Sequence, residues 1–233
     1  MDGLLATLSF GFLLGMQHSL DADHVVAVST IVSENKTMLR SSFLGMLWGV
    51  GHSITLFLVG GLVLIFKLAI PPILARAMEF IVGLVLVILG FSLLWKLIVE
   101  RVPALHLHFH RHKGASHIHL HSHEAENHGH NHERKSIITG GIQGLAGSAA
   151  LMLLVLASID TITLGLFFIL VFGVGSILGM LIISTFLSLP FTYTTGIENI
   201  NEKIRWAVGF ISIFLGLSIM AEIYFEKGLF YAF

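Results

Sequence analysis

The second half of this chain contains a long stretch with almost no charge. Between Ser136 and Ile197 the only charged side chain is that of Asp160. Across all 233 residues 55% are hydrophobic and 12% are charged, whereas roughly 25% are charged in a typical soluble domain. Because about 20 apolar residues cross the hydrocarbon of a bilayer, the stretch can hold two crossings, with Asp160 at the turn between them. The chain is therefore predicted to be an all-α integral membrane protein.

Six apolar segments are predicted to be transmembrane helices by the same criterion. In chain order they cover about 3–33, 42–66, 76–97, 137–159, 161–191 and 204–225. They divide the chain into a first membrane part, 1–100, a polar loop, 101–136, and a second membrane part, 137–233. No basic residue precedes the first segment, so it is predicted to be a span and not a cleaved signal peptide.

The orientation follows from the distribution of Lys and Arg. Ten of the 13 lie in or beside the connections after the first, third and fifth spans, and three lie on the other side. Short basic loops tend to stay in the cytoplasm. We therefore expect a multi-pass protein of the cell membrane with both termini outside and the polar loop in the cytoplasm.

Two short matches relate the halves of the chain. Residues 15–19 (GMQHS) can be aligned with 144–148 (GLAGS), and 48–53 (WGVGHS) resembles 172–176 (FGVGS). Two three-helix halves of opposite orientation would form an inverted repeat, a plan of many transporters with a site near the midplane. The matches are mostly glycine and serine, which also occur wherever membrane helices pack closely. Both interpretations remain open at this point.

A cluster of ionisable residues lies inside the first predicted span. The segment HSLDADH carries His18, Asp21, Asp23 and His24, and such groups are costly in hydrocarbon unless they have a function. In an unbroken helix, Asp23 would point away from the other three. Either Asp23 then has a separate role, such as orienting an imidazole, or the helix is unwound here so that it can present ligands to an ion.

His52 lies near the middle of the second span and adds a third imidazole. The chain has no cysteine, so any metal site must use nitrogen and oxygen ligands. Imidazole suits Ni²⁺, Co²⁺ and Zn²⁺, whereas Mg²⁺ and Ca²⁺ prefer oxygen. The sequence therefore predicts a transition-metal site within the membrane, although interhelical hydrogen bonding is the alternative. The predicted ligands are His18, Asp21, Asp23, His24 and His52.

The polar loop is rich in histidine. Its composition cannot build an apolar core, so we expect it to be disordered without metal, and neutral imidazoles there would buffer or deliver metal with little selectivity. The eleven histidines are His106, His108, His110, His112, His117, His119, His121, His123, His128, His130 and His132.

The membrane part resembles the nickel/cobalt transporter superfamily. His18, followed by four residues and then by Asp23 and His24, matches the His-x4-Asp-His signature of that family, and Gly51-His52-Ser53 resembles its second, shorter motif. The resemblance implies that His18, Asp23 and His24 select the metal with His52 beside them. Six predicted spans are similar to the shorter branch of the superfamily, which contains importers, exporters and accessory proteins of nickel enzymes.

These observations predict a transporter of Ni²⁺ or Co²⁺, with Zn²⁺ also open, and not an enzyme. The metal is the substrate and no prosthetic group is expected. The expected partners are the ion, the lipid bilayer and cytoplasmic metal-delivery proteins, with no nucleic acid. Two alternatives stay open: an intramembrane zinc-dependent hydrolase, and a metal-sensing or accessory membrane subunit.

Overall fold

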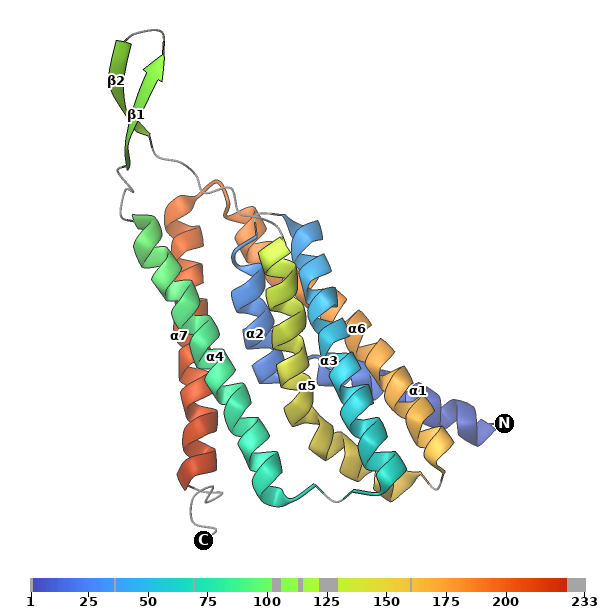
Figure 1. Ribbon diagram of the computed structural model, residues 1–233. Coiled ribbons are helices and arrows are strands. Elements are labelled where there is room, and N and C mark those ends of the chain that lie inside the picture. The colour runs from blue at the N-terminus through green and yellow to red at the C-terminus, as the bar shows by residue number, and fades with distance from the viewer. Residues whose placement is uncertain are drawn as a thin grey trace.

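A computed structural model describes residues 2–35, 37–68, 70–101, 106–112, 115–121, 130–159 and 161–225. These residues form helices that run along one bundle, and a hairpin that projects from one end of it (Figure 1). In chain order the elements are α1 (Asp2–His18), α2 (Ala22–Val32), α3 (Met38–Phe66), α4 (Pro72–Arg101), β1 (His106–His112), β2 (Ala115–His121), α5 (His130–Ser158), α6 (Ile162–Tyr193) and α7 (Glu198–Phe225).

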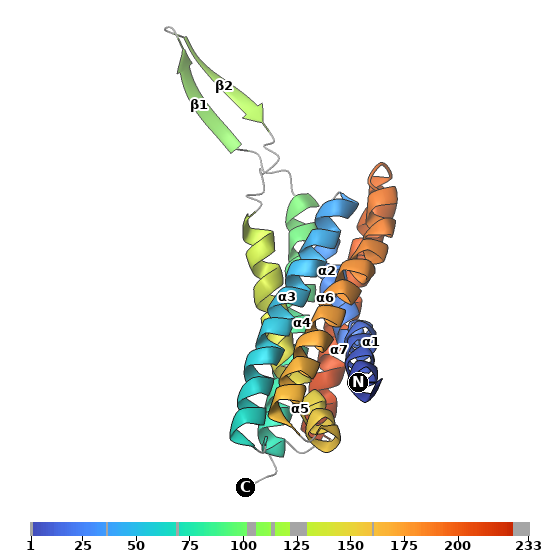
Figure 2. The ribbon, with the colours of Figure 1, turned by 90° about the vertical axis from the view of Figure 1, so that its right-hand side faces the viewer.

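The short helix α2 lies at the centre of the bundle. It contacts α3, α4, α6 and α7, while α3 packs against α5 and α6, α1 packs against α6, and α4 packs against α7. Figure 2 shows the same bundle from the side, with α1 seen nearly end-on beside the lower half of α6. Val28, Trp48 and Met180 are fully buried where α2, α3 and α6 meet. Apolar burial therefore holds α2 in place between α3 and α6.

The first predicted span is two helices and not one. α1 ends at His18, and α2 begins at Ala22. The hydroxyl of Ser19 donates to the carbonyl of Met16, and Asp21 is extended, with ψ of 140°, which takes the chain out of the α-helical region. Two alternatives were open for this segment, an unbroken helix and a helix unwound at the ionisable cluster, and the structure shows the second.

Four helices among the described residues are long and apolar enough to cross a membrane: Met38–Phe66, Pro72–Val99, Ile162–Tyr193 and Asn199–Phe225. Leu4–His18 and Ala22–Val32 are shorter apolar helices. Large apolar side chains stay exposed along the outside of the bundle, as at Phe214, which is 73% exposed. These features support a multi-pass membrane protein, while the count of six spans stays a prediction.

Helix α5 ends at Ser158 and α6 begins at Ile162, so the chain turns where the sequence predicts a turn. The hydroxyl oxygen of Thr161 accepts a hydrogen bond from the backbone N–H of Leu164, at 3.4 Å, which caps the helix. Asp160, which was expected at this turn, lies outside the described residues.

The described part of the polar loop forms an antiparallel hairpin, so the expectation of disorder is wrong there. In both strands histidine alternates with Leu, Phe or Ile at most positions, and a period of two is the pattern of a strand. His123 and His128 lie outside the described residues, and His130 and His132 belong to the first turn of α5. The register pairs histidine with histidine at alternate positions: His106 with His121, His108 with His119, and His110 with His117.

Candidate metal centre

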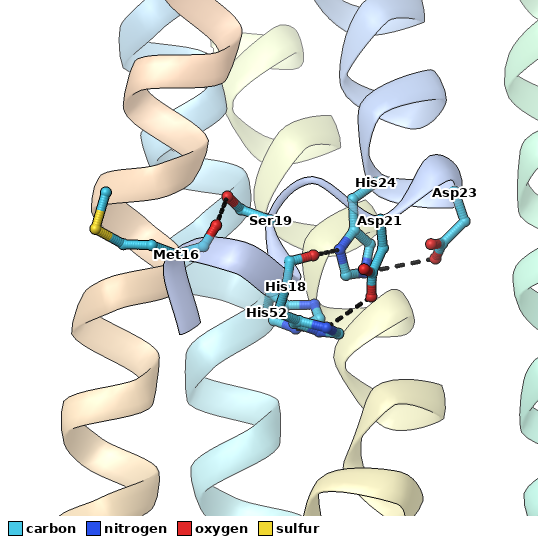
Figure 3. Close-up of polar contacts among 7 residues, drawn as sticks. All are labelled: Met16, His18, Ser19, Asp21, Asp23, His24 and His52. Carbon is cyan, nitrogen blue, oxygen red and sulfur yellow. Dashed lines mark hydrogen bonds and ion pairs between the residues drawn. The ribbon is translucent and has the colours of Figure 1, made fainter. Parts of the chain in front are cut away.

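Three imidazoles from three helices meet at the break between α1 and α2 (Figure 3). His18 is the last residue of α1, His24 lies in the first turn of α2, and His52 lies in the middle of α3. His24 and His52 are buried, at 2% and 0% exposure. The Nε2 atoms of His18 and His52 are 3.2 Å apart, and one nitrogen from each of the three rings lies within 4.8 Å of the others.

The hydrogen bonds of two rings determine which nitrogen is free. Nδ1 of His24 lies 3.0 Å from the carbonyl oxygen of His18, and a carbonyl can only accept, so His24 carries its proton on Nδ1. Nδ1 of His18 lies 2.8 Å from Oδ2 of Asp21 and donates to that carboxylate. In their neutral forms both rings therefore keep a lone pair on Nε2, the atom that a metal would bind.

The distance between the imidazole nitrogens fits a metal ion. Two nitrogens bound to a tetrahedral ion at about 2.0–2.1 Å lie about 3.3 Å apart. The 3.2 Å between Nε2 of His18 and Nε2 of His52 is close to that value. The same distance is that of an N–H···N hydrogen bond between the two rings, and a cation in place of the shared proton could bind both of them with little movement of the side chains.

The two carboxylates have different contacts. Asp21 holds His18 through its Nδ1, in the way that carboxylates orient metal-binding imidazoles. Oδ2 of Asp23 lies 3.5 Å from Nε2 of His24, and both atoms are acceptors when that ring is neutral. A proton or a cation between them would make this contact favourable. Asp21, Asp23 and His24 form a second group that could hold a metal, and it shares His24 with the first group.

The helix ends add to the electrostatics of the site. Asp21 and Asp23 lie at the N-terminus of α2, where the helix dipole favours negative charge, and His18 lies at the C-terminus of α1, where it favours positive charge. Asp21 occupies the N-cap position but makes no side-chain capping hydrogen bond. Its carboxylate contacts the imidazole of His18 instead, which indicates that the residue is placed for the site and not for the helix end.

Two residues of the surroundings were not singled out as site residues from the sequence. The indole of Trp48 stacks on His52, with ring centroids 5.1 Å apart, and meets His24 edge-on at 4.9 Å. Gln143 of α5 donates from Nε2 to the backbone carbonyl of Asp23, at 3.4 Å. The spacing of Trp48 four residues before His52 is a signal for a shared helix face, whereas no local signal connects Gln143 to Asp23.

One loop histidine contacts the far end of α2. Glu34, just after that helix, lies 3.4 Å from Nδ1 of His132 and 3.5 Å from Nζ of Lys96. Burial lowers the pKa of His132, and Lys96, Lys135 and Arg40 lower it further, while Glu34 opposes them. The end of the histidine-rich segment is thereby joined to the helix whose other end carries His24.

The comparison with known proteins gives a relative of nearly full length. The urease accessory protein UreH of Bacillus sp. (strain TB-90) is 38% identical over 230 residues, which cover 97% of this chain and 96% of UreH. This chain belongs to the UreH family. The name of that member describes an accessory protein, which is consistent with the expectation that the chain is not an enzyme.

More distant relatives of this UreH family member occur in plants. The chloroplast proteins FOR GROWTH AND FERTILITY 1 and 2 of Arabidopsis thaliana are 27% and 25% identical over 232 and 228 residues. The matches cover 98% and 94% of this chain but 62% and 57% of the plant proteins. No family model matches the chain, and no solved structure matches it.

Proposed function

We propose that this UreH family member transports Ni²⁺ or Co²⁺ across a membrane through the site at the break between α1 and α2. The observation that carries the proposal is the meeting of three imidazoles, two of them buried, within a bundle of apolar helices. Unwound backbone at membrane depth is tolerated where it lines a cavity or binds an ion. Nitrogen ligands favour a first-row transition metal over Mg²⁺ or Ca²⁺.

The graded exposure of the site supports passage and not only binding. The side chain of Asp21 is 52% exposed and that of Asp23 is 26%, whereas those of His18 and His24 are 20% and 3%. A hydrated cation would meet the carboxylates first and exchange its water for imidazole nitrogen further in. His24 belongs to both groups, so the ion could move between them without leaving protein ligands.

Nickel is our preferred substrate because of the relative. The name of UreH suggests a role in nickel handling for urease, and the sequence resembles the nickel/cobalt transporter superfamily in the residues that form the site. The ligand chemistry alone accommodates Ni²⁺, Co²⁺ and Zn²⁺. The histidine-rich segment would hold ions on the cytoplasmic side before or after transport.

Radionickel flux into proteoliposomes tests the proposal. The full chain, purified in detergent and reconstituted with known sidedness, is expected to carry ⁶³Ni²⁺ into the vesicles well above protein-free liposomes. Unlabelled Co²⁺ should compete more strongly than Mg²⁺ because it binds imidazole better. A flux equal to that of empty vesicles on both orientations of the protein would contradict transport.

The second candidate is an accessory role without transport, which the name of UreH favours. In that case the isolated chain would bind nickel at the same site but would give no flux. Nickel-dependent thermal stabilisation of the reconstituted protein, together with zero uptake, would indicate this role.

Replacing Asp21 tests how the first imidazole is oriented. Asp21→Ala removes the acceptor for Nδ1–H of His18, so the ring can turn and take the other tautomer. We expect the KM for Ni²⁺ uptake to rise about 10-fold to 100-fold, the usual cost of losing such a partner. Asp21→Asn keeps an oxygen acceptor and should lose less. An unchanged KM in Asp21→Ala would show that Asp21 does not orient the site.

A further inference from the structure

Helices from the two halves of the chain make close backbone contacts at glycines, and these contacts follow a common pattern. Between α1 and α6, a Cβ atom added at Gly15 would meet the carbonyl oxygen of Phe172, and one added at Gly175 would meet that of Phe12. At such points two helix backbones touch, since no side chain fits between them. These contacts define which residues of α1 and α6 lie side by side.

The same pattern recurs between α5 and α3. A Cβ atom added at Gly140 would meet the carbonyl oxygen of Trp48, and one added at Gly51 would meet that of Ile137. A shift of 125 residues takes Gly15 to Gly140 and Phe12 to Ile137, and a shift of 124 takes Trp48 to Phe172 and Gly51 to Gly175. Each of these contacts between α1 and α6 thus has its counterpart between α5 and α3.

The pair α4 and α7 obeys a similar rule. A Cβ atom at Gly83 would meet the carbonyl oxygen of Gly216, and one at Gly90 would meet that of Gly209. A shift of 126 residues exchanges these contacts, because it takes Gly83 to Gly209 and Gly90 to Gly216. We infer that the two halves are structural repeats related by a pseudo-twofold axis. The packing pairs Gly15 with Gly140, and not with Gly144 as in the sequence alignment above.

This correspondence gives two residues of the metal site a counterpart. The shifts of 125 and 124 take His18 to Gln143 and His52 to Ser176. Gln143 and Ser176 are each 1% exposed. Oε1 of Gln143 and Oγ of Ser176 are buried without a hydrogen-bond partner among the described residues. Buried polar atoms are rarely left in this state without a ligand or water.

Gln143 lies against the site already described. Its Nε2 donates to the backbone carbonyl of Asp23, at 3.4 Å, and a Cβ atom on the next residue, Gly144, would meet the carbonyl oxygen of His52 at 2.5 Å. The amide is therefore anchored by its nitrogen between α2 and α3, and its oxygen is left for another partner.

We propose that Gln143 is a further member of the cation site, supplied by the second half of the chain. Its Oε1 is a neutral oxygen ligand for the same divalent ion that His18, His24 and His52 bind, which rests on the proposed function. The two repeats thus contribute unlike groups to one site: imidazoles from the first and an amide oxygen from the second.

Two substitutions separate the role of the amide oxygen from that of the amide nitrogen. Gln143→Leu removes both the oxygen and the N–H donor, whereas Gln143→Glu keeps an oxygen ligand and loses only the donor. The matched control is Gln17→Leu, the same change at an exposed glutamine of α1. The readout is the rise in Tm of the full chain in detergent on adding Ni²⁺. Every variant keeps the histidine-rich segment, so the contribution of that segment to the rise is the same in all of them.

We expect Gln143→Leu to lose most of the nickel-dependent rise in Tm, as His24→Asn should also do. The KM of Gln143→Leu for ⁶³Ni²⁺ uptake should rise about 10-fold, as for a lost supporting ligand. Gln143→Glu and Gln17→Leu should keep the rise in Tm. A normal nickel response in Gln143→Leu would overturn the proposal, as would an equal loss in Gln143→Glu, since the bond to Asp23 would then be what matters. Absence of flux in the wild type is a separate result that contradicts transport and leaves the Tm test decisive.

Discussion

His24→Asn is expected to abolish nickel uptake while the protein still folds. His24 is the residue common to both groups of ligands, and its Nε2 is the free nitrogen because Nδ1 donates to the carbonyl of His18. The amide nitrogen of asparagine can take the place of Nδ1 and keep that hydrogen bond. It offers nothing in the place of Nε2, so the ion loses a ligand and the folded chain loses little else.

The expected fall in kcat/KM for ⁶³Ni²⁺ uptake exceeds about 100-fold, because the loss of a supporting partner alone costs about 10-fold to 100-fold. The control is Ser29→Ala in the same helix, where the hydroxyl donates to the carbonyl of Val25 one turn earlier. That variant should transport normally. Uptake by His24→Asn at the rate of Ser29→Ala, with equal amounts of protein in the vesicles, would remove His24 from the site.

Gly140→Ala is expected to destabilise the protein strongly. Exchange of glycine for alanine inside a helix otherwise stabilises it by about 0.8–1.0 kcal/mol. At Gly140 the new Cβ would meet the backbone carbonyl of Trp48, and a backbone atom cannot rotate away as a side chain can. α5 would have to move off α3, and overpacking of this kind costs about 1–3 kcal/mol or more.

The same movement should impair nickel uptake, because Trp48 stacks on His52. Thermal unfolding in detergent and ⁶³Ni²⁺ flux measure the two effects. Gly61→Ala on α3 is the matched control, since its added Cβ would lie 3.5 Å from Cδ2 of Leu166, an ordinary contact. If Gly140→Ala were as stable as Gly61→Ala, the close approach of α5 and α3 would be wrong.

The metal-site residues could be chosen from the sequence because the free-energy cost of placing an ionisable group in hydrocarbon depends on that residue and its segment alone. Ionisable groups inside an apolar segment stand out whatever the fold is, and the spacing of His18, Asp21 and His24 already restricted them to one region. The separate contacts of Asp21 and Asp23 could not be predicted. They depend on the extended backbone at Asp21, which directs one carboxylate to His18 and the other to His24.

Gln143 shows what the sequence could not indicate. It lies in an apolar helix far along the chain, and a single amide there is also compatible with a hydrogen bond between helices. Its importance appears only when α5 packs on α3 and brings it to Asp23. The hairpin is the opposite case. The alternation of histidine with apolar residues is a strand signal that can be read from the sequence. We expected disorder instead because the loop is too polar to build an apolar core.

The amino-acid sequence by itself determined that the chain is apolar enough for a membrane and that any metal must be bound by nitrogen and oxygen, since hydrophobicity and ligand type belong to single residues. Only the tertiary structure decided which lone pairs face one another, because that depends on where the first helix breaks and on how closely the glycines of α1, α3, α5 and α6 allow their backbones to approach. Long-range contacts of this kind are properties of pairs of helices, and no local pattern encodes them.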